Sequence, residues 1–327
     1  MNESDQISLE LGPESVLDLE RAARAVREGL LVIMPTETVY GLAGNALDPM
    51  AVARIYEAKE RPRFNPLIVH LAELSDVARV AREIPPELAK LAEAFWPGPL
   101  TLVLPKRDEV PDLVTAGMPT VAVRIPRHPV ARALITRAGV PLAAPSANRF
   151  MELSPTSVSV LSPAIAERAA VVLDGGPCTV GVESTIVAYL DGAVRCLRAG
   201  GIAIEELEKI VGQVPAWQAP KGAEKILAPG MMKRHYAPRT PCRLDPSERP
   251  APGKRTGLLS FLPPGERSGY ETIEVLSESG DLNQAAARLF AALARLDRGG
   301  LDEIHCHTVP DVGLGRAIND RLRRASE

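Results

Sequence analysis

Apolar positions in the first two hundred residues follow two alternating patterns. Short aliphatic runs bounded by proline, glycine or polar residues predict buried strands at 30–34, 67–69, 100–104, 120–125, 141–144 and 171–173. One more strand is expected to begin near 184, and a further strand is expected to end near 198. Apolar residues three or four positions apart predict helices at 16–28, 50–59, 84–95, 130–138 and 204–211. Alternating strands and helices indicate an α/β fold, with antiparallel pairs where the connections are short.

The periodicity stops after residue 212 and restarts further on. Residues 213–241 contain several prolines and glycines, which predicts a linker between a first domain, 1–212, and a second, 242–327. Strands at 258–262, 272–276 and 303–307 and helices at 282–296 and 316–325 predict a small Rossmann-like α/β domain. The linker stretch 227–238 is rich in Met, His and Tyr, so we expect a functional lid; a strand packed on both domains is the alternative.

A cationic loop precedes one of the predicted strands. Lys59, Arg61 and Arg63 occupy alternate positions before a strand that ends at His70. Ligand sites of open α/β sheets lie at such strand ends, and a cationic loop there suits phosphates or carboxylates. A solvated basic loop is the alternative.

Other polar side chains lie near strand ends in the same half of the chain. They are Thr38, Arg124, Ser146 and Ser184, and with His70 they would form one polar cavity if the strand ends converge. Arg124 is flanked by apolar residues, so it requires a buried anionic partner or an anionic ligand. The turn around Thr36 and Thr38 has a second interpretation, as a helix cap, and Ser154 is expected to cap a helix.

Composition narrows the protein class. The chain has 327 residues, 46% of them hydrophobic and 24% charged, which suits an ordinary globular protein of two domains. A net charge of −3 and only 4% aromatics argue against a chain that wraps nucleic acid. The polar, acidic first fifteen residues do not resemble a signal peptide, and no apolar run reaches the roughly 20 residues of a membrane span. Four scattered cysteines give no zinc or disulfide pattern, so we expect a cytoplasmic protein with reduced thiols.

The small domain carries two weak motifs. Gly313 and Gly315 could approach a phosphate, but the full dinucleotide motif is missing. His305 and His307 share one face of a strand; without a third ligand they are predicted to be surface residues rather than a metal site.

Motifs for covalent catalysis are missing. The sequence contains no phosphate-binding P-loop, nucleophile elbow, zinc-protease or kinase motif. The remaining candidates are cations, hydroxyls and an amide, which suit a reaction between bound substrates at positioned anions, such as adenylation.

Eight motifs in order closely resemble the YrdC-type L-threonylcarbamoyladenylate synthases, in the two-domain form. They lie at 35–42, 59–70, 96–101, 120–124, 144–148, 154–156, 181–186 and 229–238. The resemblance implies a YrdC-like twisted mixed sheet with flanking helices in the first domain. It also implies formation of threonylcarbamoyl-AMP and pyrophosphate from L-threonine, bicarbonate and ATP, with magnesium carried by the ATP phosphates and no protein metal site. The product would pass to threonylcarbamoyl-transfer machinery that acts on tRNA, with no stable nucleic-acid binding by this chain.

The resemblance also implies residue roles. L-threonine would contact Thr38, His70, Arg124, Ala144 and Ser184. Lys59 and Arg61 would neutralise bicarbonate, carbamate and phosphate oxygens. ATP would contact Arg61, Asn65, Thr120, Ser146, Asn148, Ser154, Arg198 and Tyr236. Arg124 can bind a carboxylate through two hydrogen bonds.

Three positions depart from the family pattern. Ala199 stands where proline is usual, and Met232 and Lys233 stand where lysine and tyrosine are commoner. Arg63, with its neighbour Phe64, lies in a variable part of the loop and is given no role.

Two other functions are weighed against the synthase. One is an RNA-binding protein that uses the cationic cavity, which the acidic first half of the chain and the few aromatic residues disfavour. The other is a carbamoyltransferase, but the accessory modules of such proteins, including a Cys-x-x-Cys pair, are absent from this sequence.

Overall fold

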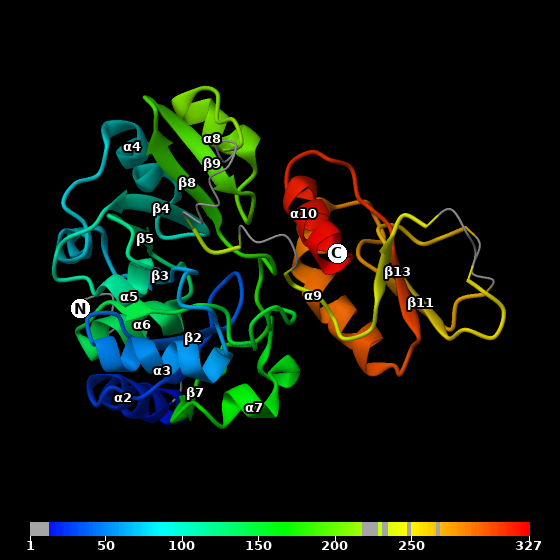
Figure 1. Ribbon diagram of the computed structural model, residues 1–327, viewed down its shortest axis with the longest axis horizontal. Coiled ribbons are helices and arrows are strands. Elements are labelled where there is room, and N and C mark those ends of the chain that lie inside the picture. The colour runs from blue at the N-terminus through cyan, green and yellow to red at the C-terminus, as the bar shows by residue number, and fades with distance from the viewer. Residues whose placement is uncertain (1–12, 218–227, 231–234, 247–249, 266–268) are drawn as a thin grey trace.

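The computed structural model describes residues 13–217, 228–230, 235–246, 250–265 and 269–327, and Figure 1 shows them as a larger and a smaller domain. The larger domain contains, in order, α2 (Pro13–Arg27), β1 (Val32–Met34), β2 (Gly41–Asn45), α3 (Pro49–Lys59), β3 (Ile68–His70), η1 (Leu74–Arg79), α4 (Pro86–Phe95), β4 (Leu100–Pro105), α5 (Asp112–Thr115), β5 (Thr120–Arg124), α6 (Pro129–Ala138), β6 (Leu142–Ala143), η2 (Val158–Val160), α7 (Pro163–Ala166), β7 (Val171–Val172), β8 (Thr185–Leu190), β9 (Ala193–Arg198) and α8 (Ile204–Val211).

The strands of the larger domain form one mixed sheet, which confirms the predicted α/β class. Its order is β7-β1-β2-β6-β3-β5-β4-β8-β9. The pairs β1–β7, β3–β5 and β4–β8 are parallel, and the other pairs are antiparallel. Strands distant in sequence therefore lie side by side at the centre of the sheet.

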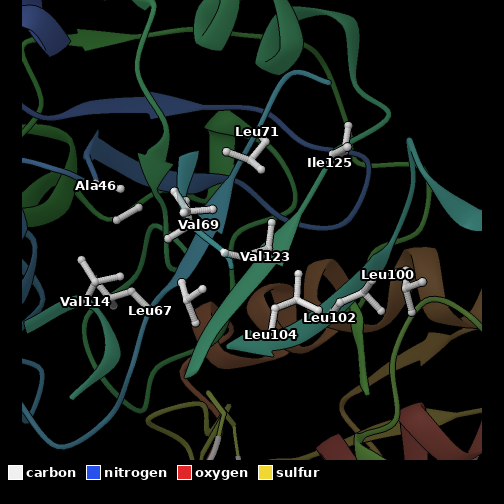
Figure 2. Packing of buried hydrophobic residues seen from close by; sticks show 14 of the residues in the cluster. Ala46, Leu67, Val69, Leu71, Leu100, Leu102, Leu104, Val114, Val123 and Ile125 are labelled. Atoms are coloured by element: carbon white, nitrogen blue, oxygen red, sulfur yellow. The ribbon is translucent and has the colours of Figure 1, made fainter. Parts of the chain in front are cut away.

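The two faces of this sheet are covered differently. One face carries the main apolar core, in which Val69, Val123 and Leu102 project from neighbouring strands (Figure 2). Apolar residues of helices α3, α4 and α5 belong to the same core. On the other face, α2 and α6 cover β1, β2 and β6. The rest of that face, over β3, β5, β4 and β8, packs against Ala228 of the linker. Because side chains alternate along a strand, His70 and Arg124 lie on this second face.

The smaller domain contains β10 (Cys242–Leu244), β11 (Thr256–Ser260), β12 (Thr272–Val275), α9 (Leu282–Arg298), β13 (Glu303–Cys306) and α10 (Gly315–Ala325). Its sheet is parallel throughout, in the order β10-β13-β11-β12. Helices α9 and α10 lie on the side that faces the larger domain (Figure 1). Their apolar core also includes Val39 and Val182 of the larger domain and Tyr236 of the linker, so the two domains and the linker share one packed interface.

Several local predictions are wrong. Strand β2 follows directly where only a polar turn was expected. Strand β10 begins the smaller domain, in a stretch for which no element was predicted. No helix begins at Ser154, because its hydroxyl donates to the Glu183 carboxylate instead of capping a helix. His305 is buried rather than exposed, between Tyr270 and Glu303.

No helix in the described part of the chain is both long enough and apolar enough to cross a lipid bilayer. Within the same residues, no group of three or more His, Cys, Asp or Glu side chains is arranged to hold a metal ion.

Candidate functional site

A pocket lies on the second face of the large sheet, beneath the described residues of the linker. Strand ends, the loops that follow them and the linker all contribute to its wall. Its lining residues are Thr36, Thr38, Val39, Gly41, Arg61, Ile68, His70, Arg124, Ala144, Pro145, Ser146, Glu183, Ser184, Arg198, Pro229, Gly230, His235 and Tyr236. The polar strand-end residues therefore do converge on one cavity.

The turn between β1 and β2 brings two hydroxyls to the pocket. The Thr36 hydroxyl accepts hydrogen bonds from the backbone N–H groups of Thr38 and Val39, both at 3.2 Å. It also lies 2.8 Å from the Thr38 hydroxyl. Thr36 thus caps this turn, but strand β2 follows it rather than a helix.

Arg124 is held at the end of β5 by three groups from other parts of the chain. Its Nη1 donates to the Thr38 hydroxyl at 2.8 Å, its Nη2 to Glu37 Oε1 at 2.6 Å and its Nε to the Gly98 carbonyl at 3.2 Å. Burial alone would raise the pKa of Glu37, but the charge and hydrogen bond of Arg124 outweigh it and lower that pKa. The guanidinium is therefore fixed in position while it lines the pocket.

His70 is the direct register partner of Arg124 across the parallel pair β3–β5. Its Nδ1 lies 3.2 Å from the Ile68 carbonyl oxygen, so the neutral ring carries its proton on Nδ1 and leaves Nε2 as an acceptor. Burial, followed by the nearby Arg124 charge, lowers the pKa of His70 to about 3. The ring is consequently neutral near pH 7.

Ser184, just before β8, joins two further side chains. Its hydroxyl lies 2.7 Å from the Thr101 hydroxyl and accepts from Arg198 Nη2 at 3.1 Å. Arg198 also donates to the Ser184 carbonyl and, at 3.3 Å, to the Pro229 carbonyl of the linker. A Cβ on Gly200 would lie 2.3 Å from the Glu183 carbonyl oxygen, so only glycine allows this close approach.

Arg61 and Lys59 have different surroundings despite their spacing in sequence. Arg61 lines the pocket and donates to the carbonyls of Asn65 and Pro66, at 3.1 and 2.9 Å. Burial lowers its pKa to about 10, so it stays charged near pH 7. The Lys59 ammonium donates to the carbonyls of Ser146 and Asn148 and does not line the pocket. Lys59 therefore anchors the 146–148 loop, and burial lowers its pKa well below the usual value.

Four described linker residues, Pro229, Gly230, His235 and Tyr236, line the pocket. Tyr236 is 2% exposed, and its backbone has φ = 61°, a left-handed conformation that is uncommon for tyrosine. The His235 ring packs edge-on against it, with a centroid distance of 4.0 Å. Met232 and Lys233 lie outside the described residues, so their departure from the family pattern is not part of this geometry.

The predicted site residues divide into two groups. All five predicted threonine contacts line the pocket, as do Arg61, Ser146, Arg198 and Tyr236. Five others lie outside the lining. Lys59 is buried at the end of α3, and Asn65 and Asn148 are buried in loops. Ser154 binds Glu183, and Thr120 begins β5, about 13 Å along the strand from Arg124.

Sequence reasoning gave no role to three residues of this site. Glu37 and Glu183 each lie next to a predicted threonine contact, and His235 precedes Tyr236. Each glutamate lies directly beside a threonine or serine in a short turn next to a strand, and this is the sequence feature that could have identified both. Each of them forms an ion pair with a buried arginine.

Family models match most of the chain. Residues 24–200 match the family model of Sua5, YciO and YrdC proteins. This model is described as telomere recombination. Residues 202–327 match a model described as the C-terminal domain of threonylcarbamoyl-AMP synthase. The boundary between the two models lies just after Gly200.

Full-length relatives support the same two-domain arrangement. The threonylcarbamoyl-AMP synthase of Pyrococcus abyssi is 42% identical over 315 residues, which covers 93% of each chain. That of Bacillus subtilis is 40% identical over 326 residues, covering 94% of this chain and 92% of the relative. The crystal structure of P. abyssi Sua5 complexed with L-threonine has a TM-score of 0.85 at 41% identity and covers 94% of both chains.

Proposed function

The chain belongs to the threonylcarbamoyl-AMP synthase family, and from this premise we propose that it forms L-threonylcarbamoyl-AMP and pyrophosphate from L-threonine, bicarbonate and ATP. One observation carries the proposal. A single pocket brings together Thr38, His70, Arg124, Ala144 and Ser184 with the cations Arg61 and Arg198. An amino acid and a nucleotide phosphate can therefore be held in contact there.

The β3–β5 end of the pocket suits L-threonine. Arg124 would bind the carboxylate, and the hydroxyls of Thr38 and Ser184 offer hydrogen bonds to the polar groups of the amino acid. Nε2 of neutral His70 is an acceptor, so it suits the amine or hydroxyl of threonine rather than its carboxylate. Ala144 supplies a small apolar wall for the methyl group.

Arg61 and Arg198 suit the phosphates of ATP. Both guanidiniums line the pocket, together with Ser146 and the linker residue Tyr236. Lys59, Asn65 and Asn148 would act by holding the surrounding loops, and Ser154 through Glu183. A contact from Thr120 would require the nucleotide to extend along β5.

The reaction needs no nucleophile from the protein. The threonine amine adds to bicarbonate with loss of water, and a carbamate oxygen then attacks the α-phosphorus of ATP, with pyrophosphate leaving. Each species is anionic, so Arg61, Arg124 and Arg198 can hold them together against their mutual repulsion. Lys59 lies beneath the same loop and would contribute by holding it through the carbonyls of Ser146 and Asn148.

Magnesium would enter with the phosphates of ATP rather than in a protein cage. Arg61 and Arg198, which line the pocket, would face the phosphates that carry the ion. When bound, the ion would neutralise phosphate charge. Threonylcarbamoyl-AMP would then pass to a cytoplasmic transfer machinery that modifies tRNA.

The test is product identification by mass spectrometry together with pyrophosphate release. Wild-type protein should release pyrophosphate only when threonine, bicarbonate and ATP are all present. Arg124→Gln should reduce the rate at least a hundredfold, whereas Arg82→Gln, which changes an exposed arginine paired with Asp108, should not. Pyrophosphate release independent of threonine would refute the proposal.

A further inference from the structure

Arg321 of helix α10 lies at the junction of the two domains and the linker. Its side chain is 0% exposed. Its Nε donates to Glu183 Oε2 at 2.9 Å, and its Nη2 donates to the Ala199 carbonyl at 3.0 Å. Both acceptors belong to the larger domain, whereas Nη1 pairs with Asp320 of its own helix at 2.7 Å.

The face of the same guanidinium covers the linker residue Tyr236. The distance from the Arg321 Cζ to the ring centroid is 4.8 Å, a cation–π contact. The left-handed backbone of Tyr236 is a strained conformation for a residue other than glycine. Contacts of the ring with Arg321, His235 and Phe290 therefore hold a conformation that the linker would otherwise leave.

Glu183 transmits the second contact of Arg321 to the pocket. One carboxylate oxygen accepts from Arg321, and the other accepts from the Ser154 hydroxyl at 2.6 Å. Glu183 itself lines the pocket next to Ser184. One buried cation thus fixes a lining carboxylate, the hydroxyl behind it and the aromatic residue above the cavity.

We propose that Arg321 is a positioning residue through which the smaller domain sets the affinity of the pocket for ATP, by fixing Glu183 and Tyr236, without itself contacting the nucleotide. This inference rests on the proposed function for the identity of the nucleotide. The threonine end of the pocket has its own anchor, since Arg124 is held by Glu37, Thr38 and Gly98. Loss of Arg321 should therefore affect the two substrates unequally.

The experiment compares full-length Arg321→Met, Arg321→Lys and wild-type proteins by calorimetric titration with ATP–magnesium and, separately, with L-threonine. Arg321→Met should weaken ATP binding at least tenfold and change threonine affinity by less than twofold. Arg321→Lys keeps the charge but cannot make all three directional contacts, so its ATP affinity should fall between the other two. Arg295→Met removes an exposed ion pair with Glu274 in the same domain and should bind both ligands as wild type does.

Kinetics separate positioning from a general loss of structure. In Arg321→Met the KM for ATP should rise at least tenfold while kcat falls less than threefold. Because Arg321 acts partly through Ser154, the effects of Arg321→Met and Ser154→Ala on ATP affinity should be less than additive in the double variant. Melting curves establish that each variant is folded at the assay temperature.

Each result decides between stated alternatives. Equal ATP affinity in Arg321→Met and wild type, or an equal loss for ATP and threonine, would overturn this inference and leave the proposed synthase intact. Wild-type protein that binds ATP but releases no threonine-dependent pyrophosphate would overturn the proposed function alone. Wild-type protein that binds no ATP would overturn both.

Discussion

Arg124 and Glu37 form a buried ion pair, with Nη2 and Oε1 2.6 Å apart and side chains only 4% and 5% exposed. The two residues are 87 positions apart in sequence. Neither charge has contact with bulk water to compensate it, so each depends on the other until an anionic substrate enters. Substrate recognition and stability therefore depend on the same arginine.

Removing the arginine alone should be costly. Arg124→Gln leaves the Glu37 carboxylate buried and unpaired, so the free energy of unfolding should fall by about 3–5 kcal/mol. The double variant with Glu37→Gln has no unpaired charge and should recover part of this loss. Urea denaturation measures both, with Arg82→Gln as an exposed control. Equal losses in the single and double variants would show that the pair is not the cause.

The depressed pKa of His70 predicts a pH dependence of stability. Its folded pKa of about 3 lies below the usual 6.5, so the unfolded chain binds the extra proton between these values. Stability from this group is present above pH 6.5 and is lost as the pH falls towards 3. Between pH 7.5 and 5 the loss is about 2 kcal/mol.

His70→Asn removes this titration. Unfolding free energies at pH 7.5 and 5 should therefore differ less in the variant than in the wild type, by about 2 kcal/mol. The comparison uses only the change with pH, so any constant cost of the substitution cancels. An unchanged pH dependence in the variant would contradict a neutral, buried His70.

Lys59 should hold the 146–148 loop in its observed conformation. Lys59→Met leaves the carbonyls of Ser146 and Asn148 without their donor, which should cost about 3 kcal/mol of unfolding free energy. Pyrophosphate release should fall at least tenfold, because Ser146 then loses its position in the pocket wall. Lys209→Met, at an exposed pair with Glu206, should change stability by less than about 0.5 kcal/mol. Full activity in Lys59→Met would contradict the loop-anchoring role.

The Gly200→Ala variant tests the close approach of Gly200 to the backbone of Glu183 and Ser184. An added Cβ would lie 2.3 Å from the Glu183 carbonyl oxygen and 2.4 Å from the Ser184 carbonyl carbon, so the backbone must move. Gly200→Ala should lower the unfolding free energy by about 2–3 kcal/mol and raise the KM values. Gly265→Ala has no atom within 4 Å of the new Cβ and serves as its control. Similar stability in the two variants would refute the steric argument.

The part of the site that sequence reasoning found consists of residues at strand ends. Runs of buried apolar residues locate strands, and parallel or mixed sheets bring strand ends together, so Thr38, His70, Arg124 and Ser184 could be grouped before the fold was known. The cationic loop could be assigned to anion binding by charge, but charge alone does not orient a side chain. Arg61 lines the pocket, whereas Lys59 turns to backbone carbonyls.

The part that sequence reasoning missed depends on tertiary pairing. Strand β2 contains two glycines and has little intrinsic strand propensity, so its pairing with β1 and β6 decides its conformation. Ser154 has the local sequence of a helix cap, but a carboxylate 29 positions away is its acceptor. Glu183, which accepts a hydrogen bond from Arg321, is 138 positions away from it, and no local pattern links the two residues.

The pairing of His70 with Arg124 across β3–β5 limits how this pocket can change. A single inserted or deleted residue within β5 would turn the guanidinium into the aliphatic core and present a valine or isoleucine to the ligand. Length variation is therefore forbidden along these strands and tolerated in the connections that follow them. New substrate preferences in this architecture must arise by exchanging side chains at fixed strand positions or by remodelling the surrounding loops.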